Sequence, residues 1–179
     1  YEFAVIAYNV NGNHDWGIND VPTHITATTG TPGLRLISNC QQLQDIQNNL
    51  DDNYELAGNI DCSDTISWNG GAGFLPIGDP FNEIPFTGLL EGNNYSISDL
   101  HINQSGGEYS LAAPFAYANN AAFQDIRIVR PVISGSASVV TYAAGLVVIN
   151  TSNDNMGAIT NVHITDAQLG AELDGSVIS

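Results

Sequence analysis

The sequence repeats a six-residue pattern three times, and this repetition constrains the fold more than any other feature of the chain. The pattern is apolar, any residue, Asp or Asn, apolar, any residue, apolar, and it occurs at residues 97–102, 123–128 and 159–164. These copies start 26 and 36 residues apart. A second segment, residues 111–116, is matched by residues 142–147. Short apolar runs that recur at imperfect periods of this size, with Asn and Gly between them, are typical of solenoids.

The predicted fold class is all-β: a right-handed parallel β-helix of a few coils, with a short N-terminal capping helix and a preceding β-hairpin. In such a fold each coil supplies short strands that pair with the next coil about 4.8 Å away. The composition agrees, because 43% of the residues are hydrophobic and only 12% are charged, which is typical of a globular chain. We expect the β-helix domain to occupy residues 38–179.

Residues 40–49 carry the helical signal. Leu43, Ile46 and Leu50 recur at helical spacing, and Ser38 or Asn39 is the expected N-cap. This short helix should cover the N-terminal end of the β-helix, together with the glycine-rich loop that contains Trp68. Residues 31–37, which contain Pro and Gly, are predicted to be a linker.

Residues 1–30 have the alternation of two strands joined by a long loop. They resemble the last two strands of a fibronectin type III domain through Tyr1, Phe3, Val5, Ala7, Tyr8, Asn9 and Gly12, followed by a Thr-rich strand. The resemblance implies an incomplete domain, so we expect the hairpin to find its partner strands in another segment or another chain.

The chain from residue 43 onwards resembles the opening of GLUG-repeat β-helix domains. The spaced positions that carry this resemblance are Leu43, Ile46, Asn53, Tyr54, Leu56, Ile60, Trp68, Pro76, Phe86, Gly92, Tyr95, Ile97, Leu100 and Ile102. Residues 144–146 stand where that family has its Gly-Leu signature, whereas residues 113–115 depart from it. The resemblance implies a large secreted or cell-surface bacterial protein.

The charge excludes several functions. The chain has 19 acidic residues against three basic ones, which gives a net charge of −16, and all three basic residues are arginines. Binding to nucleic acid or to an anionic membrane surface needs many cations, so neither is expected. No apolar run approaches the ~18 residues of a membrane span, so we expect no membrane insertion.

Cys40 and Cys62 belong to no CxxC pair and to no cluster with zinc spacing. They form either a disulfide or two buried thiols. The acidic, lysine-free composition favours a secreted protein, where disulfides persist, and therefore favours the disulfide. Such a bond would tie the capping helix to the first coil.

Stacking the three copies in register aligns Asp99, Asp125 and Asn161 in one column. This column is either a ladder of polar corner residues or, through Asp99 and Asp125, a carboxylate pair for acid/base hydrolysis of a glycoside. Two carboxylates one coil apart should raise one of the two pKa values.

The same stacking aligns His101, Arg127 and His163 in a second column on the outer face, with Arg130 close by. These residues form either a solvated surface or a docking face for a ligand that carries a carboxylate. Trp68 either stacks on a sugar ring or plugs the end of the core.

Calcium is the one cofactor that the sequence suggests. Asp51, Asp52, Asp61 and Asp64 are the candidate ligands, although they do not match the EF-hand loop.

The leading functional hypothesis is a non-catalytic extracellular segment, structural or adhesive, of a large surface protein or a self-assembling matrix filament. Its partners would be further copies joined head to tail, or neighbouring domains of a longer chain. The alternative is a β-helix that binds or hydrolyses polysaccharide. The motifs GxSxG and HExxH are both missing from the sequence, so neither of these marks a nucleophile or a zinc protease site.

Overall fold

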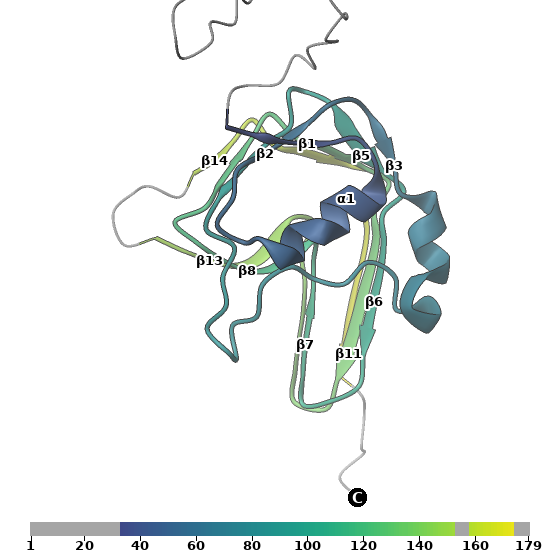
Figure 1. Ribbon diagram of the computed structural model, residues 1–179. Helices are drawn as coiled ribbons and strands as arrows, with labels where there is room; N and C mark the ends of the chain where they lie inside the picture. Colours follow the sequence, from purple (N-terminus) through teal and green to yellow (C-terminus); the bar gives the residue numbers. More distant parts are fainter. Residues whose placement is uncertain (1–32, 153–157, 174–179) are drawn as a thin grey trace, which may run out of the picture.

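The described part of the chain folds into a parallel β-solenoid of about four coils with two short helical segments (Figure 1). This computed structural model describes residues 33–152 and 158–173. The predicted fold class is therefore confirmed. The hairpin predicted for residues 1–30 lies outside the described residues.

Strands from successive coils pair in parallel to form the walls of the solenoid. The first sheet contains β1 (Arg35–Ile37), β2 (Tyr54–Leu56), β4 (Leu89–Glu91), β9 (Ala122–Gln124) and β14 (Ile159–Thr160). The second contains β3 (Ile60–Asp61), β5 (Ser96–Ser98), β10 (Arg127–Val129) and β15 (His163–Thr165). The third contains β6 (His101–Ser105), β11 (Val132–Ala137) and β16 (Gln168–Leu173). Two strand pairs complete the described walls: β7 (Tyr109–Ala112) with β12 (Val140–Ala143), and β8 (Phe115–Asn119) with β13 (Val147–Thr151).

The register of the second sheet corrects the predicted stacking of the repeats. Ile97 pairs with Ile128, and Ile128 pairs with Ile164, so the spacings are 31 and 36 residues. The copy at residues 97–102 therefore stacks on residues 128–133, not on residues 123–128.

The reason for the error is that every coil turns two similar corners, one before and one after the second sheet. Asp125 and Asn161 lie at the first corner and Asp99 lies at the second, and all three adopt the left-handed conformation with φ between 51° and 56°. The six-residue pattern fits either corner. At the second corner of the next coil, Arg130 stands in the Asp or Asn position of the pattern and Pro131 stands in the apolar position that follows. This copy therefore cannot be recognised from the sequence.

Columns of apolar side chains run along the inside of the solenoid. Ile60, Ile97, Ile128 and Ile164 form one such column. Phe86, Phe115 and Phe123 form an aromatic cluster with ring centroids 4.8–5.8 Å apart. Burial of each such side chain contributes roughly 1.5–3 kcal/mol, so these columns are the main source of stability.

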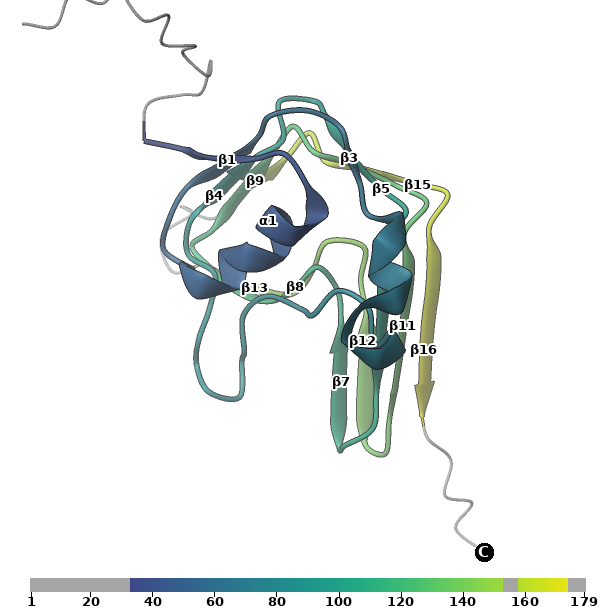
Figure 2. The same ribbon diagram turned by 45° about the vertical axis from the view of Figure 1, so that its right-hand side comes forward.

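Helix α1 (Cys40–Gln44) and the 3-10 turn η1 (Asp45–Asn48) lie across the N-terminal end of the solenoid (Figures 1 and 2). The Asn39 side chain caps α1 by accepting a hydrogen bond of 2.9 Å from the backbone N–H of Gln42. Leu43 and Ile46 are fully buried against the core. The predicted helix is thus confirmed. Residues 35–37, expected to be linker, instead form β1 and begin the first sheet.

The segment around Trp68 forms the second helical element, η2 (Ser63–Gly71). It lies beside β6 at the edge of the third sheet (Figure 1). The backbone N–H of Asn103 donates to the carbonyl of Ala72, and the N–H of Phe74 donates to the carbonyl of His101. Trp68 is half-buried against the core. The segment therefore covers a strand edge, which is one way in which proteins block unwanted pairing.

An arm projects from the ring of strands, formed by β6 with β7 in one coil and by β11 with β12 in the next (Figure 1). Its two layers lie close together. A Cβ atom at Gly135 would lie 2.6 Å from the hydroxyl oxygen of Ser110 and 3.3 Å from the Cβ of Ala112. Only small residues fit between the layers at this point.

The C-terminal end of the described solenoid presents apolar side chains to solvent. Ile159, Ile164 and Leu169 continue the inward columns, yet 50%, 41% and 50% of their surfaces are exposed. No residue among the described ranges covers this end. Within the described residues, the solenoid therefore has one end that is covered by a helix and one end that exposes apolar side chains.

Cys40 and Cys62 form a disulfide, with 5.3 Å between their Cα atoms, so the predicted pairing is confirmed. The bond joins α1 to the residue that follows β3.

We expect the free energy of unfolding to be about 3 kcal/mol higher for the oxidised protein than for the reduced protein, because the bond restricts the unfolded chain. Urea denaturation with and without reductant measures the difference. A double variant, Cys40→Ala with Cys62→Ala, should resemble the reduced protein; equal midpoints for all three forms would contradict this prediction.

Candidate functional site

The two candidate catalytic carboxylates lie at different corners of the coil. Asp99 directly follows β5, and Asp125 lies two residues before β10. Since β5 and β10 are parallel neighbours in the second sheet, the two side chains stand at opposite ends of that sheet. The hypothesis of an Asp99–Asp125 acid/base pair is therefore wrong.

Asp99 is instead bound by Arg130 of the next coil. The Nε atom of Arg130 donates to Oδ1 of Asp99 at 2.9 Å, and Nη2 donates to Oδ2 at 2.6 Å. These hydrogen bonds, with the positive charge of Arg130, hold the pKa of Asp99 below its ordinary value. The ion pair therefore contributes to stability above the ordinary pKa and is lost as the pH falls through the lowered one. A carboxylate that stays ionised in this way is a poor general acid.

The other corner forms a polar ladder along the solenoid. Nδ2 of Asn161 donates to Oδ1 of Asp125 and lies 3.4 Å from Oδ1 of Asn94. The ring of His163 forms a 2.9 Å hydrogen bond with Oδ1 of Asn161. These contacts match the structural interpretation of the Asp and Asn column, because the amide of Asn161 in the next coil binds the carboxylate of Asp125.

The expected column of His101, Arg127 and His163 is only partly formed. Arg127 pairs with His163 in the second sheet, and both side chains are exposed. His101 lies in the third sheet beside Val132. Arg130 extends from the corner after β10 and is engaged with Asp99. The four residues do not line one pocket of the described structure.

The candidate calcium ligands do not form one cluster in the described structure. The carboxylate of Asp52 forms an ion pair with Arg35 at 2.6 Å, and Oδ1 of Asp61 accepts a hydrogen bond from the backbone of Ser63 at 2.9 Å. Within residues 33–152 and 158–173, no group of three or more His, Cys, Asp or Glu side chains is placed to hold a metal ion. Asp51, Asp52, Asp61 and Asp64 therefore do not form the proposed site.

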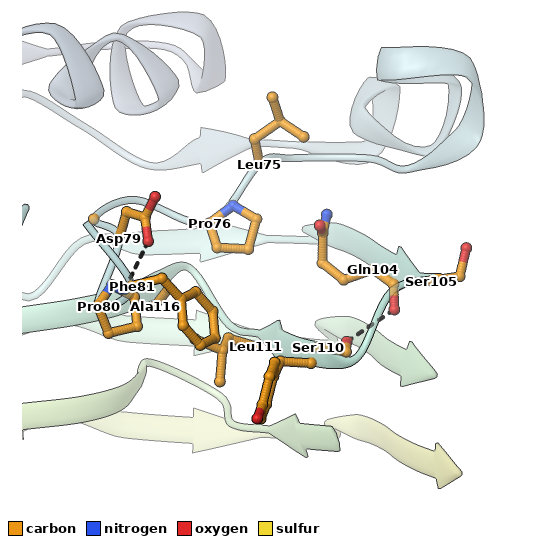
Figure 3. A pocket seen from close by; sticks show the side chains of 13 residues that line it. Leu75, Pro76, Asp79, Pro80, Phe81, Gln104, Ser105, Ser110, Leu111 and Ala116 are labelled. Carbon is orange, nitrogen blue, oxygen red and sulfur yellow. Dashed lines mark hydrogen bonds between the residues drawn. The ribbon is translucent and has the colours of Figure 1, made fainter. Parts of the chain in front are cut away.

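A cavity of about 360 Å³ lies between the projecting arm and a hairpin-like loop at residues 79–84 (Figure 3). Phe81 from the loop and Tyr109 from the arm form its rim, with ring centroids 5.2 Å apart. Both rings are largely exposed, Phe81 by 62% and Tyr109 by 48%. Leu75, Pro76 and Leu111 add apolar lining.

Two polar side chains line this cavity, one a hydrogen-bond acceptor and the other an amide. Asp79 accepts hydrogen bonds from the side chain of Asn82 at 2.6 Å and from the backbone of Phe81 at 2.9 Å, which lower its pKa. Nε2 of Gln104 is buried and has no hydrogen-bond partner in the described structure. The lining contains no basic residue. The cavity thus offers an apolar ring surface and a fixed acceptor to a neutral ligand, whereas Nε2 of Gln104 is shielded from solvent.

Sequence reasoning missed this cavity because its two sides come from segments about 25 residues apart. The residues 79–84 form a turn of ordinary composition. The only signal in the sequence is an aromatic residue between Pro and Asn, which is too common to predict a site.

The comparisons with known proteins found one significant similarity among curated sequences. The chain is 42% identical over 106 residues to Halomucin of Haloquadratum walsbyi. The matched region is 56% of this chain but only 1% of Halomucin. No protein-family model matches the chain, and no solved structure is significantly similar to it. The resemblances to GLUG-repeat and fibronectin type III-like domains therefore stay predictions. Among the described residues, no helix is long and apolar enough to cross a membrane.

The Asp99–Arg130 contact makes a measurable prediction. Replacing Arg130 by Gln should move the pKa of Asp99 upward towards its ordinary value, because the guanidinium that stabilises the carboxylate is gone. A carboxyl-carbon NMR titration measures this pKa directly. Arg127→Gln is the matched control, since Arg127 is exposed and has no bond to Asp99. An equal shift in both variants would show that general charge, rather than this contact, sets the pKa.

Proposed function

We propose that this chain is a non-catalytic structural segment of a large extracellular surface protein. The observation that carries the proposal is the similarity to a 1% portion of Halomucin, combined with a solenoid whose last coil exposes its apolar columns. By its name that relative is a mucin-type protein, which favours a secreted or surface location. The disulfide supports the same location, because such bonds persist in oxidising compartments.

The arrangement of polar residues also supports a structural role. The carboxylates that could have acted in catalysis are engaged in an ion pair or in a corner ladder. Repeated polar corners with apolar columns between them are what a stacked scaffold needs. A role in adhesion is a further proposal, and it would use the outer wall rather than the core.

We infer that the apolar end is covered by a later part of the same long chain rather than by the N-terminal end of another copy. Helix α1 lies across the N-terminal end and is held there by the disulfide. Coil-on-coil stacking of two copies, head to tail, would have to displace that helix. A following coil of the same chain needs no displacement.

Two measurements test this function in the source organism. Antibodies raised against residues 33–173 should label intact, unpermeabilised cells and should recognise, on a denaturing gel, a chain far heavier than 19.0 kDa. Antibodies against a cytosolic protein, which should label only permeabilised cells, control for leakage. Labelling that appears only after permeabilisation would contradict the surface location, and a monomeric 19.0 kDa chain would contradict the longer chain.

A second candidate function is recognition of a neutral sugar in the cavity between the arm and residues 79–84. Aromatic faces stack on the C–H face of a sugar ring, while carboxylates and amides bond its hydroxyls. Phe81 and Tyr109 provide the aromatic faces, and Asp79 provides the carboxylate. An anionic ligand is disfavoured, because the lining has a carboxylate and no cation.

This second function predicts weak, specific binding of single sugars. Saturation-transfer-difference NMR with the methyl glycosides of glucose, mannose, galactose and N-acetylglucosamine should give a signal that falls at least tenfold in Phe81→Ala and in Tyr109→Ala. Tyr142→Ala is the control, because Tyr142 is an exposed aromatic residue of the next coil that does not line the cavity. No signal from the unmodified protein, or equal loss in the control, would exclude the cavity as a sugar site.

A further inference from the structure

Three asparagines in the described solenoid begin an Asn-x-Ser triplet. They are Asn94, followed by Tyr95 and Ser96; Asn103, followed by Gln104 and Ser105; and Asn150, followed by Thr151 and Ser152. This triplet is the acceptor pattern for N-linked glycosylation in secreted proteins. The pattern is short and occurs often by chance, so the environment of each side chain decides whether it can accept a sugar.

All three asparagine side chains are exposed. Asn94 lies at the corner between β4 and β5, Asn103 lies on β6, and Asn150 lies on β13. Along β6, the buried Ile102 and the half-buried Gln104 flank the exposed Asn103, which therefore points away from the core. Each triplet thus presents its asparagine to solvent from the lateral wall of the solenoid.

The atom that would be glycosylated is free at each of these sites. The sugar attaches to Nδ2, and Nδ2 of Asn94, Asn103 and Asn150 has no hydrogen-bond partner within the described structure. At Asn94 and Asn103 the amide oxygen is the atom in use. Oδ1 of Asn94 lies 3.4 Å from Nδ2 of Asn161, and Oδ1 of Asn103 accepts a hydrogen bond from Ser134 at 3.1 Å.

Four other exposed asparagines show the opposite arrangement. In each of these the side chain uses Nδ2 as a donor in a structural hydrogen bond: Asn69, Asn82, Asn93 and Asn161. None of these four residues begins an Asn-x-Ser or Asn-x-Thr triplet. The exposed Asn39, Asn53 and Asn59 also use only Oδ1, as an acceptor, so a free Nδ2 is a condition that the acceptor sites meet and not a property that sets them apart.

The strand neighbours of Asn103 and Asn150 also leave space for a sugar. In the third sheet Asn103 lies beside Ser134, which in turn lies beside Gly170, so no bulky side chain flanks it on that row. In the pair of β8 and β13, Asn150 lies beside Ala118. A sugar residue attached at either position extends into solvent over small side chains.

We propose that Asn94, Asn103 and Asn150 carry N-linked glycans. This inference rests on the proposed extracellular location. The reaction requires an oligosaccharyltransferase and a lipid-phosphate-linked sugar donor. A bond forms between Nδ2 and C1 of the sugar, the bond between C1 and the donor phosphate oxygen breaks, and Nδ2 loses one proton. The lipid phosphate is the leaving group.

The three sites lie on the side walls of the solenoid and away from its ends. They project from three different walls, in the two coils that hold β4 to β13, and none lies on α1 or on the last strands β14 to β16. Glycans at these sites would surround the wall of the solenoid and would leave both ends free for neighbouring segments.

The test is peptide mapping by mass spectrometry of the protein purified from its source organism. Peptides that contain Asn94, Asn103 or Asn150 should carry mass increments of whole sugar residues, whereas peptides that contain Asn69 or Asn82 should have their unmodified masses. All three acceptor peptides at their unmodified masses would overturn the proposal.

A matched pair of variants made in the same organism tests the acceptor directly. Ser105→Ala removes the hydroxyl of the triplet and should abolish the increment at Asn103, whereas Ser105→Thr retains the hydroxyl and should keep it. Both should give the circular dichroism spectrum of the unmodified sequence, since Ser105 is exposed at the end of β6. An increment that persists in Ser105→Ala would overturn the assignment of Asn103. If antibodies label the protein on intact cells but the protein carries no sugar, only this inference is overturned. If the protein is intracellular, the proposed function is overturned as well.

Discussion

The parallel pairing of one coil on the next is the interaction on which the rest of this structure depends. It places Ile on Ile through four coils of the second sheet, and it stacks an aromatic or large aliphatic residue at each level of the first. Such stacking requires every coil to turn its corners in the same way. The left-handed conformation at Asp99, Arg130 and Asp166, with φ between 52° and 56°, meets that requirement at the corner after the second sheet. Arg is an unusual residue for this conformation, and its bidentate bond to Asp99 gives the side chain a partner there.

The sequence alone predicted the parts of the fold that leave a local signal. The short strands, the helix with its Asn39 cap and the Cys40–Cys62 pairing could each be inferred from spacing and composition. The register could not, because two corners of every coil share one pattern and the Arg130-Pro131 copy does not show it. The sequence does not distinguish the first strand from a linker, since three residues are too few to show a period and only the pairing with β2 defines it.

The candidate sites illustrate the same limit. Grouping Asp99 with Asp125 depended on a register that proved to be shifted by one wall of the coil. The cavity bounded by Phe81 and Tyr109 depends on how two projections approach each other, which no stretch of sequence encodes by itself.

The charge of the chain is easier to interpret from the sequence. A chain with a net charge of −16 and three arginines repels itself in dilute buffer. In about 1 M salt the screening length falls to ~3 Å, so such a chain suits a medium of high salt concentration.

The disulfide also determines how the molecule would respond to mechanical tension. If a surface protein is pulled from its two ends, force that enters at residue 33 passes from Cys40 directly to Cys62 through the covalent bond. The 22-residue separation between them, about 75 Å of extended chain, is excluded from the path of the load. The capping helix and β2 both lie inside that closed loop. Tension along the chain therefore cannot extend the helix away from the end of the core, and the solenoid would have to yield first at β1 or at its later coils.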